Sequence, residues 1–264
     1  MGVLNVTPDS FSDGGAYPSL ASAIARAEQM VAEGAAIIDI GAESTRPGSF
    51  PVSLQEELDR LIPLVERVVQ LVPVPVSVDT SKPQVMREVL SVGAGLINDV
   101  RALQEPGALE LMSQFDVPVC LMHMRGTPAT MQDSPEYDDV VADVKAFLDN
   151  RVGVCAKHGI GLDRIVVDPG FGFGKTFAHN LDLLRHLSAF TDIGAPVMVG
   201  MSRKGMIGTI VGGPPPARLF GSLAAAVVAV QNGASIVRAH DVAATVQSLR
   251  VCAAVNEISD VGGA

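Results

Sequence analysis

Apolar and polar positions follow a repeating pattern along nearly the whole chain. Eight short apolar runs each end at polar residues able to bind a ligand or do chemistry. The runs cover residues 2–5, 36–39, 74–79, 95–99, 118–123, 164–168, 196–202 and 235–240. Short, almost continuous apolar runs rich in Val, Ile and Leu are typical of parallel strands buried on both faces.

Segments with helical periodicity lie between these runs. They cover residues 19–33, 53–71, 82–92, 106–115, 135–158, 178–187, 219–232 and 242–258. Eight alternations of strand and helix imply right-handed crossovers and a parallel sheet closed into a (β/α)8 TIM barrel. A Gly-Ala pair precedes three of the strands, and its glycine, at 34, 93 or 233, is expected to stop the helix in the left-handed conformation.

The length of the chain favours one domain. Its 264 residues match the roughly 250 of a single barrel, and no linker or composition break divides them, so we expect one domain over 1–264. Only 4% of residues are aromatic against 48% hydrophobic, so the core must be built from Ala, Val, Ile and Leu. In such a barrel the active site lies at the carboxyl ends of the strands.

Charge and cysteine content restrict the partners and the compartment. A formal net charge of −10 opposes a nucleic-acid surface, so an anionic ligand needs a local cluster of cations. No apolar run reaches the ~18 residues of a membrane span, and the first four residues lack the charged start of a signal peptide. The three cysteines show no metal-ligand spacing and are interpreted as buried apolar residues. We expect a soluble, cytosolic protein.

Two loops and one helix stand out. The loops 7–18 and 43–51, after the first and second strands, are rich in turn formers and could act as lids over the site. Residues 223–230 are apolar on every side of the predicted helix, so we expect cover on two sides. A homodimer interface is the favoured cover, and a helix deep in one subunit is the alternative.

Cations gather where the barrel would close. The last strand neighbours the first, so Arg238 and His240 should face Asn5, with Arg46 on the loop after the second strand. Two guanidinium groups and an imidazole suit a phosphate or diphosphate, and loops near the end of the barrel often bind one. The alternative is that Arg238 pairs with Asp241 or another neighbouring carboxylate.

Asp79, Asn98 and Asp168 end three middle strands. A metal site usually gathers its ligands more densely, with His among them. A heterocycle with a guanidine-like edge fits a carboxylate through two parallel charge-assisted hydrogen bonds. Alternatively, Asp168 caps the turn that begins at Pro169.

A lysine and two aromatic residues complete the candidate set. Lys204 follows the seventh strand and could bind a ring atom, stabilise charge or form a Schiff base. Phe171 and Phe173 lie among glycines after the sixth strand, where they could stack on a flat ligand.

These residues resemble the dihydropteroate synthase family over residues 1–252. The matching segments, each near a predicted strand end, are NVTPDSFSDGG (5–15), ESTRPG (43–48), SVDT (77–80), IND (97–99), DPGFGFGK (168–175), SRK (202–204) and RAHD (238–241). The resemblance implies a transferase that condenses 6-hydroxymethyl-7,8-dihydropterin diphosphate with 4-aminobenzoate, giving 7,8-dihydropteroate and diphosphate in folate biosynthesis.

The resemblance also implies a role for each matching residue. The pterin would be held by Asp79, Asn98, Met122, Asp168 and Lys204. Diphosphate would be held by Asn5, Arg46, Arg238 and His240, with Mg2+ on Asn5 and Asp13. The aminobenzoate would be held by Thr45, Pro47, Phe173, Lys204 and Gly205. The catalytic set would be Asp79, Asp168, Lys204 and Arg238. The least explained strand-end residues are Asp39 and His123, for which we expect a structural role.

Two positions depart from the family pattern. Ala42 stands where a second glycine is frequent, which could restrict the backbone leading into the second loop. Gly205 stands where many members have serine, so the aminobenzoate carboxylate would have to use the backbone N–H of Gly205 at a helix start.

Three other functions compete with this prediction. A pterin-binding methyltransferase of the methyltetrahydrofolate group shares the carboxylates but has no use for the cations Arg46, Arg238 and His240. A Schiff-base aldolase is supported by Lys204 alone. A pterin-binding paralogue without activity is disfavoured because every motif position is occupied.

Overall fold

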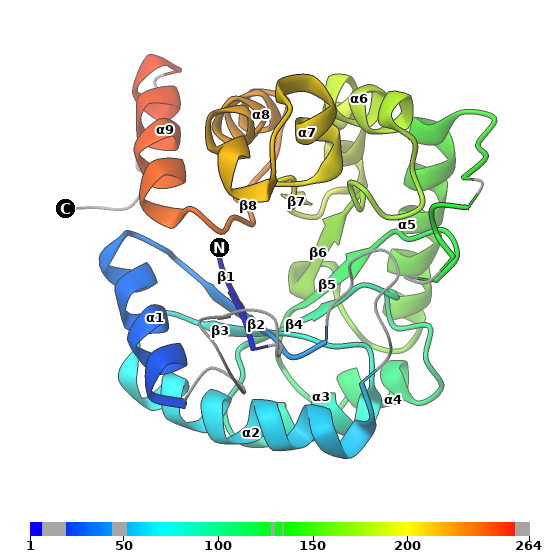
Figure 1. Cartoon of the computed structure of the whole chain (residues 1–264). Coiled ribbons are helices and arrows are strands. Elements are labelled where there is room, and N and C mark those ends of the chain that lie inside the picture. The colour runs from blue at the N-terminus through cyan, green and yellow to red at the C-terminus, as the bar shows by residue number, and fades with distance from the viewer. Residues whose placement is uncertain (7–19, 44–51, 128–129, 134, 257–264) are drawn as a thin grey trace.

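The computed structural model describes residues 1–6, 20–43, 52–127, 130–133 and 135–256. Its strands are β1 (Gly2–Asn5), β2 (Ile38–Gly41), β3 (Val76–Asp79), β4 (Leu96–Asp99), β5 (Val119–Met122), β6 (Ile165–Asp168), β7 (Met198–Val199) and β8 (Ile236–Val237). Its α-helices are α1 (Leu20–Ala32), α2 (Leu54–Leu71), α3 (Pro83–Ser91), α4 (Ala108–Met112), α5 (Val140–Lys157), α6 (Phe177–Arg185), α7 (Gly205–Val211), α8 (Leu219–Gln231) and α9 (Val242–Val255). Strand and helix alternate as predicted (Figure 1).

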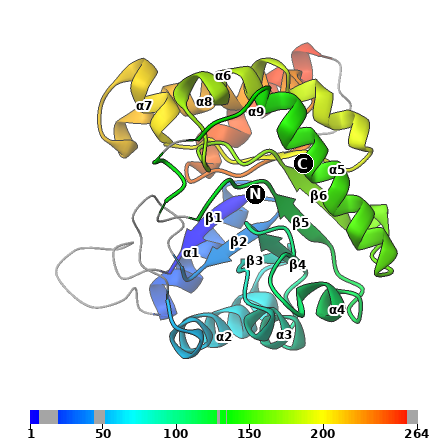
Figure 2. The same cartoon turned by 90° about the vertical axis from the view of Figure 1, so that its right-hand side faces the viewer.

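The eight strands close into a ring. Strands β1 to β6 pair in order and in parallel, and β7 pairs with β8. Two parallel bridges join these sheets, one between Val167 and Val197 and one between Gly2 and Ala239. At the second bridge, the backbone N–H of Val3 donates to the carbonyl of Ala239 over 3.0 Å. The helices lie around the outside of the strands, so the fold is the predicted TIM barrel (Figure 2).

Local signals in the sequence begin and end several helices. Asp139 caps α5 by accepting hydrogen bonds from the next turn's backbone N–H groups, and Thr176 caps α6 in a reciprocal capping box. Each of the three predicted stops has a glycine with positive φ, namely 98° at Gly34, 104° at Gly93 and 102° at Gly233. The predicted helix stops are confirmed at these positions.

The observed boundaries differ from the predicted ones in two places that bear on the site. Strand β2 begins at Ile38, two residues later than predicted, so Asp39 lies inside the strand and Gly41 ends it. An additional helix, α7, follows β7, where the sequence predicted only the helix that corresponds to α8. Strands β7 and β8 are shorter than predicted, although a backbone hydrogen bond from Arg238 to Val199 continues their pairing.

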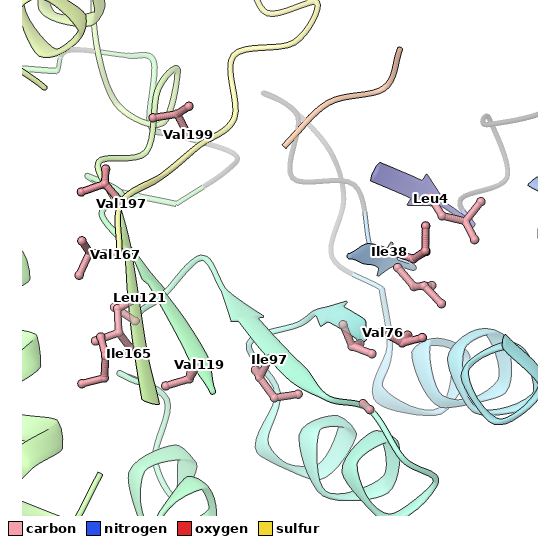
Figure 3. Close-up of a cluster of buried hydrophobic side chains, with 14 of the residues drawn as sticks. Leu4, Ile38, Val76, Ile97, Val119, Leu121, Ile165, Val167, Val197 and Val199 are labelled. Atoms are coloured by element: carbon pink, nitrogen blue, oxygen red, sulfur yellow. The ribbon is translucent and has the colours of Figure 1, made fainter. Parts of the chain in front are cut away.

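The main hydrophobic core lies between the strands and the helices. It contains buried helix residues together with alternate strand residues, which point outward under the helices (Figure 3). The residues of this set labelled there are Leu4, Ile38, Val76, Ile97, Val119, Leu121, Ile165, Val167, Val197 and Val199. A second, smaller cluster of Cys120, Val166 and Met198 fills the interior of the barrel.

The remaining alternate positions point into the barrel. Above the small interior cluster, this face carries Asn5, Asp39, Ser77, Asp79, Asn98, Met122, Asp168 and Arg238. The period of two along each strand therefore separates an apolar outer face from a polar upper interior. None of the helices in the described part of the chain combines the length and apolarity that a bilayer-spanning segment requires.

Candidate active site

The strand register brings the predicted polar residues to one end of the barrel. Gly41 pairs with both Asn5 and Asp79, and Asp79 pairs with Asn98 on the next strand. On the other side, Met122 at the end of β5 pairs with Asp168 at the end of β6. The carboxyl ends of parallel strands meet at the same edge, so these side chains surround a common mouth.

One side of the mouth is held by an arginine between two aspartates. Nε of Arg238 donates to Oδ2 of Asp39 over 2.6 Å, and Nη2 donates to Oδ2 of Asp79 over 3.0 Å. The alternative in which Arg238 pairs with a neighbouring carboxylate is therefore correct, although the partner is not Asp241. Nη1 of Arg238 makes no hydrogen bond to another described residue and can donate to a ligand.

Burial and the shared arginine act in opposite directions on the pKa of Asp79. Burial raises the pKa of Asp79 to about 7 because its charged form loses water, and the charge of Arg238 only partly offsets this. Burial would lower the pKa of Arg238, but the charges of Asp39 and Asp79 raise it above its ordinary value. The arginine stays protonated, while Asp79 titrates near neutral pH.

Asp39 lies beneath this side of the mouth and accepts hydrogen bonds from three side chains. Its side chain is fully buried, and it accepts from Ser77 Oγ over 2.6 Å and from Asn98 Nδ2 over 3.4 Å, as well as from Arg238. It therefore contacts two residues of the predicted ligand set without lying at the strand end. The sequence prediction placed Asp39 at the end of its strand, which is wrong because the run was assigned two residues too early.

Asp168 is oriented by the turn that follows it. Oδ1 accepts the backbone N–H of Gly170 over 2.7 Å, so the predicted turn cap is present. Oδ2 accepts no hydrogen bond from a described residue and remains available to a ligand. Burial raises the pKa of Asp168, while the charge of Lys204 and the Gly170 N–H act in the opposite direction. The turn cap therefore leaves one oxygen of this carboxylate available for a ligand.

Lys204 faces the same space from the far side of this turn. Its Nζ donates to the carbonyl of Phe171 and lies 4.4 Å from the centre of the Phe173 ring. Burial lowers the pKa of Lys204 to about 8, against the charge of Asp168. Among the described residues, no ion pair within 4.0 Å joins Lys204 to Asp168, so the two charges can act on a group between them.

The closing seam carries His240, another of the predicted anion ligands. Nδ1 of His240 lies 3.1 Å from the hydroxyl oxygen of Ser202, which belongs to the loop after β7. Arg203, on the same loop, has a positive φ of 62° and pairs through Nε with Asp241 over 2.9 Å. These two contacts connect the loop after β7 with the loop after β8.

Some predicted residues cannot be placed. Asp13, Thr45, Arg46 and Pro47 lie outside the described residues. Ala42, which departs from the family pattern, is fully buried, and its carbonyl accepts from Nη1 of Arg60 over 2.9 Å. The residue leading into the second loop is therefore held by helix α2.

Sequence reasoning missed a functional candidate within one of its own motifs. Lys175 is almost fully buried beside His123, with 2.9 Å between Nζ and Nδ1 of the imidazole. The position of Lys175 after three glycines offers no local signal of burial, because lysine is ordinarily exposed. His123 was singled out as a strand-end residue, but its partner lies 52 residues away.

Comparison with known families identifies the class. Residues 1–240 match the family model described as "Pterin binding enzyme", which is most of the chain. The chain therefore belongs to the pterin-binding enzymes.

Close relatives narrow this further. Dihydropteroate synthase of Escherichia coli is 53% identical over 251 residues, which is 95% of this chain and 89% of the relative. The structure of Xanthomonas albilineans dihydropteroate synthase with 4-aminobenzoic acid has a TM-score of 0.92 at 50% identity, covering 97% of this chain and 92% of that one. The complex of that organism's enzyme with 7,8-dihydropteroate has a TM-score of 0.88 at 46% identity, covering 97% and 93%. Within the pterin-binding enzymes, the family is that of the dihydropteroate synthases, which are transferases.

Proposed function

We propose that this chain condenses 6-hydroxymethyl-7,8-dihydropterin diphosphate with 4-aminobenzoate, releasing diphosphate and forming 7,8-dihydropteroate in folate biosynthesis. The observation that carries the proposal is the pair of opposed groups at the mouth. Oδ2 of Asp168 accepts no hydrogen bond from a described residue, and Lys204, on the loop after β7, lies close enough for its charge to lower the pKa of this carboxyl without forming an ion pair with it. A pterin has N–H donors on one edge and acceptors on another, so it matches both groups.

In this proposal the pterin lies between the two sides of the mouth. Asp168 accepts from the 2-amino and N3 edge, and Lys204 donates to the oxygen and ring-nitrogen side. Asp79 and Asn98 meet the ring from the opposite strands, and Met122, which is buried beside Asp168, contacts its face. Each of these side chains belongs to the end of a strand or to the loop after it, so their positions are set by the barrel.

The diphosphate lies toward the closing seam. Asp39 already balances the charge of Arg238, so the arginine supplies a directed N–H donor more than net positive charge. Arg46 would supply the remaining positive charge and His240 an imidazole ring, with Asn5 nearby on β1. The described residues therefore support a diphosphate site that needs an additional cation.

Mg2+ is proposed as this additional cation. A methyl group placed on Gly41 would lie 3.9 Å from Oδ1 of Asn5 and 3.8 Å from Oδ2 of Asp79, so both oxygens border the space above this glycine. No described side chain hydrogen-bonds to Asn5, and no group of three or more His, Cys, Asp or Glu in the described residues could hold a metal ion. One amide oxygen, with Asp13 and substrate oxygens, suits Mg2+, which keeps much of its water. When bound, Mg2+ would neutralise charge on the leaving diphosphate.

The aminobenzoate is proposed to bind against Phe173 and Lys204, near Thr45 and Pro47. Its carboxylate would meet the backbone N–H of Gly205, the first residue of α7. A methyl group at Gly205 would have no neighbour within 4 Å, so this position borders open space. The arylamine would then point toward the methylene carbon of the pterin.

The reaction needs no covalent bond to the enzyme. The bond between the methylene carbon and the diphosphate oxygen breaks, the arylamine nitrogen bonds to that carbon, and the nitrogen loses one proton. Asp79 and Asp168 stabilise the positive charge that develops on the pterin, and Arg238 and His240 stabilise the departing anion. Together with Lys204, which holds the oxygen and ring-nitrogen side of the pterin, Asp79, Asp168 and Arg238 form the proposed catalytic set, and His240 serves as a diphosphate ligand.

The decisive experiment is the release of diphosphate from the pterin substrate, with and without 4-aminobenzoate and Mg2+. We expect release that requires both, and we expect Asp168→Asn to reduce turnover on the order of 100-fold or more, because asparagine cannot accept the two N–H donors as an anion. Substrate binding without release would instead support a paralogue that lacks activity. Near-normal turnover of Asp168→Asn would remove Asp168 from this role.

A homodimer is also proposed, through helices α7, α8 and α9. Helix α8 packs against both neighbours, and its outer side is exposed, so it is not a helix deep within one subunit. The most exposed large apolar side chains of these helices are Phe220 at 80%, Val255 at 74% and Val251 at 65%. Large apolar side chains exposed on neighbouring helices support an interface there. Light scattering should give the mass of two chains, and Phe220→Glu should give the mass of one.

A cytoplasmic location and a single domain are proposed on two further observations. All three cysteines are free and buried, which is typical of proteins from reducing compartments. The closed barrel runs from β1 to α9, which supports one domain over residues 1–264. Limited proteolysis that released a stable fragment shorter than the barrel would contradict the single domain.

A further inference from the structure

Lys175 is a buried lysine to which the proposed reaction assigns no task. Its side chain ends beneath the turn that follows β6. There Nζ donates to the carbonyls of Gly170 over 2.9 Å and Phe173 over 3.0 Å. The third donor faces Nδ1 of His123 over 2.9 Å, and the His123 carbonyl lies farther away at 3.4 Å. Burial lowers the pKa of Lys175 to about 7, against the charge of Asp168. Below that pH Nζ is an ammonium group with three donors, which the two carbonyls and the imidazole satisfy completely.

His123 is suited to accept this third hydrogen bond. Burial, assisted by the charge of Lys175, lowers the pKa of His123 to about 3, so the imidazole is neutral at any working pH. A neutral imidazole can offer Nδ1 as an acceptor while Nε2 carries the proton. The ring of Phe147 packs edge-on at 4.9 Å and fixes the orientation of the imidazole. His123 therefore acts as a rigid acceptor beneath the turn.

The turn above Lys175 has little freedom to rebuild itself. Gly170, Gly172 and Gly174 all have positive φ, at 71°, 80° and 63°. A methyl group on Gly170 would lie 1.9 Å from the carbonyl oxygen of His123, and one on Gly174 would lie 2.4 Å from that of Arg125. The backbone passes close to β5 and the loop after it, so the shape of the turn depends on groups that hold it from below.

This turn also orients two residues of the proposed site. The Gly170 N–H holds Oδ1 of Asp168, and the Phe171 carbonyl holds Nζ of Lys204. Lys175 donates to the carbonyl of Gly170, the same residue whose N–H holds Asp168. A shift of the turn would therefore move the carboxylate and the ammonium group together.

We propose that Lys175 is a positioning residue for the pterin site: held by His123, it fixes the Gly170–Gly174 turn in the shape that aims Asp168 and Lys204 at the pterin. The inference rests on the proposed function, because it requires that these two residues bind the pterin. Lys175 does not touch the substrate and acts only through the turn. Its loss leaves the buried carbonyl of Gly170, the partly buried carbonyl of Phe173 and an imidazole nitrogen without their donor, and the turn must move to satisfy them.

The test is the substitution Lys175→Met, which keeps the length and volume of the side chain and removes the donors. The dissociation constant of the pterin diphosphate, measured by calorimetry without 4-aminobenzoate, should rise on the order of tenfold to a hundredfold, as for a displacement of about 1 Å at a binding site. In an Asp168→Asn background the same substitution should raise this dissociation constant by a factor that is at least about three times smaller. The reason is that Lys175 affects pterin binding through the position of Asp168.

A matched control separates positioning from general loss of stability. Leu64→Ala removes a buried side chain of helix α2, across the barrel from the turn, and should lower the melting temperature without changing the pterin dissociation constant. An unchanged constant for Lys175→Met overturns the inference, as does an equal effect in both backgrounds. If Asp168→Asn itself leaves the constant unchanged, the proposed role of Asp168 fails, and this result is distinguishable from failure of Lys175 alone.

Should Lys175→Met not fold, His123 provides the second pair of variants. His123→Asn keeps an acceptor close to the position of Nδ1, whereas His123→Leu removes it at similar volume. We expect the pterin dissociation constant to remain near its original value in the first variant and to rise at least about fivefold in the second. Equal constants in the two variants would overturn the inference.

Discussion

The two sides of the barrel mouth hold their charged groups by different means. On the side formed by β2, β3 and β8, side chains hold side chains, and Arg238 lies between Asp39 and Asp79. On the side formed by β5, β6 and β7, lysines are held by backbone carbonyls. Lys175 binds two carbonyls of the turn after β6, and Lys204 binds another.

This difference determines which changes each side tolerates. A side-chain cluster depends on the charge of each member, because removing one leaves another buried without its counter-charge. A backbone-held side depends on the path of the chain, and three glycines with positive φ define that path after β6. We therefore expect charge changes to damage the first side most and backbone changes to damage the second most.

The largest expected effect is a methyl group on the backbone-held side. Gly170→Ala places Cβ 1.9 Å from the His123 carbonyl oxygen at a φ of 71°, and we expect a loss of about 4 kcal/mol or more in the free energy of unfolding. Gly41→Ala is the matched change on the other side, where Cβ would lie 3.4 Å from the Cβ of Asp79. Its cost should stay within about 1 kcal/mol. Equal urea midpoints for the two variants would contradict the expected difference between the two sides of the mouth.

The next effect is the removal of a charge on the side-chain-held side. Asp39→Asn leaves Arg238 with one carboxylate, Asp79, whose pKa is about 7, and we expect a loss of about 3 kcal/mol in the free energy of unfolding. Asp241→Asn is the control, because its bridge to Arg203 is partly exposed and should contribute less than about 1 kcal/mol. Urea unfolding of both variants at pH 8 measures the difference. A loss below about 1 kcal/mol for Asp39→Asn would show that this side does not depend on the charge of Asp39.

A smaller effect comes from pH. Burial lowers the pKa of Lys204 to about 8, so its ammonium group is present below that pH and is lost as the pH rises through it. We expect kcat/KM for the pterin substrate to fall about tenfold per pH unit above pH 8, since this ratio reports the free enzyme. Lys204→Arg should remove the descending limb, because a guanidinium group stays protonated. A limb that persists in this variant would assign it to another group.

The smallest effect concerns the aminobenzoate. Gly205 lies at the start of α7 with open space around it, so Gly205→Ser should add a hydroxyl without a clash. One added hydrogen bond to a carboxylate predicts a KM for 4-aminobenzoate that is about two- to tenfold lower, with kcat unchanged. Gly205→Ala separates the hydroxyl from the added methylene group. If serine and alanine give the same KM, the carboxylate does not lie at this helix start.

Much of the fold follows from the order of short apolar runs and helical segments. Eight alternations predict a closed parallel barrel, because crossovers between parallel strands are right-handed and short. The boundary of β2 was less predictable. Residues 36–41 contain four apolar positions around Asp39, and a local pattern cannot decide which of them enter the hydrogen-bonded ladder. Helix α7 was missed because its seven residues, Gly205–Val211, include two glycines and are too short for a clear periodicity.

The sequence by itself determined the alternation along each strand, and with it the polar residues that face the interior of the barrel. It also determined the family, through motifs read in order along the chain. Only the tertiary structure decided the partners, because Arg238 and Asp39 are 199 residues apart, and Lys175 and His123 are 52 apart. Local propensity depends on neighbours along the chain, whereas burial and ion pairing depend on which strands the closed barrel places side by side.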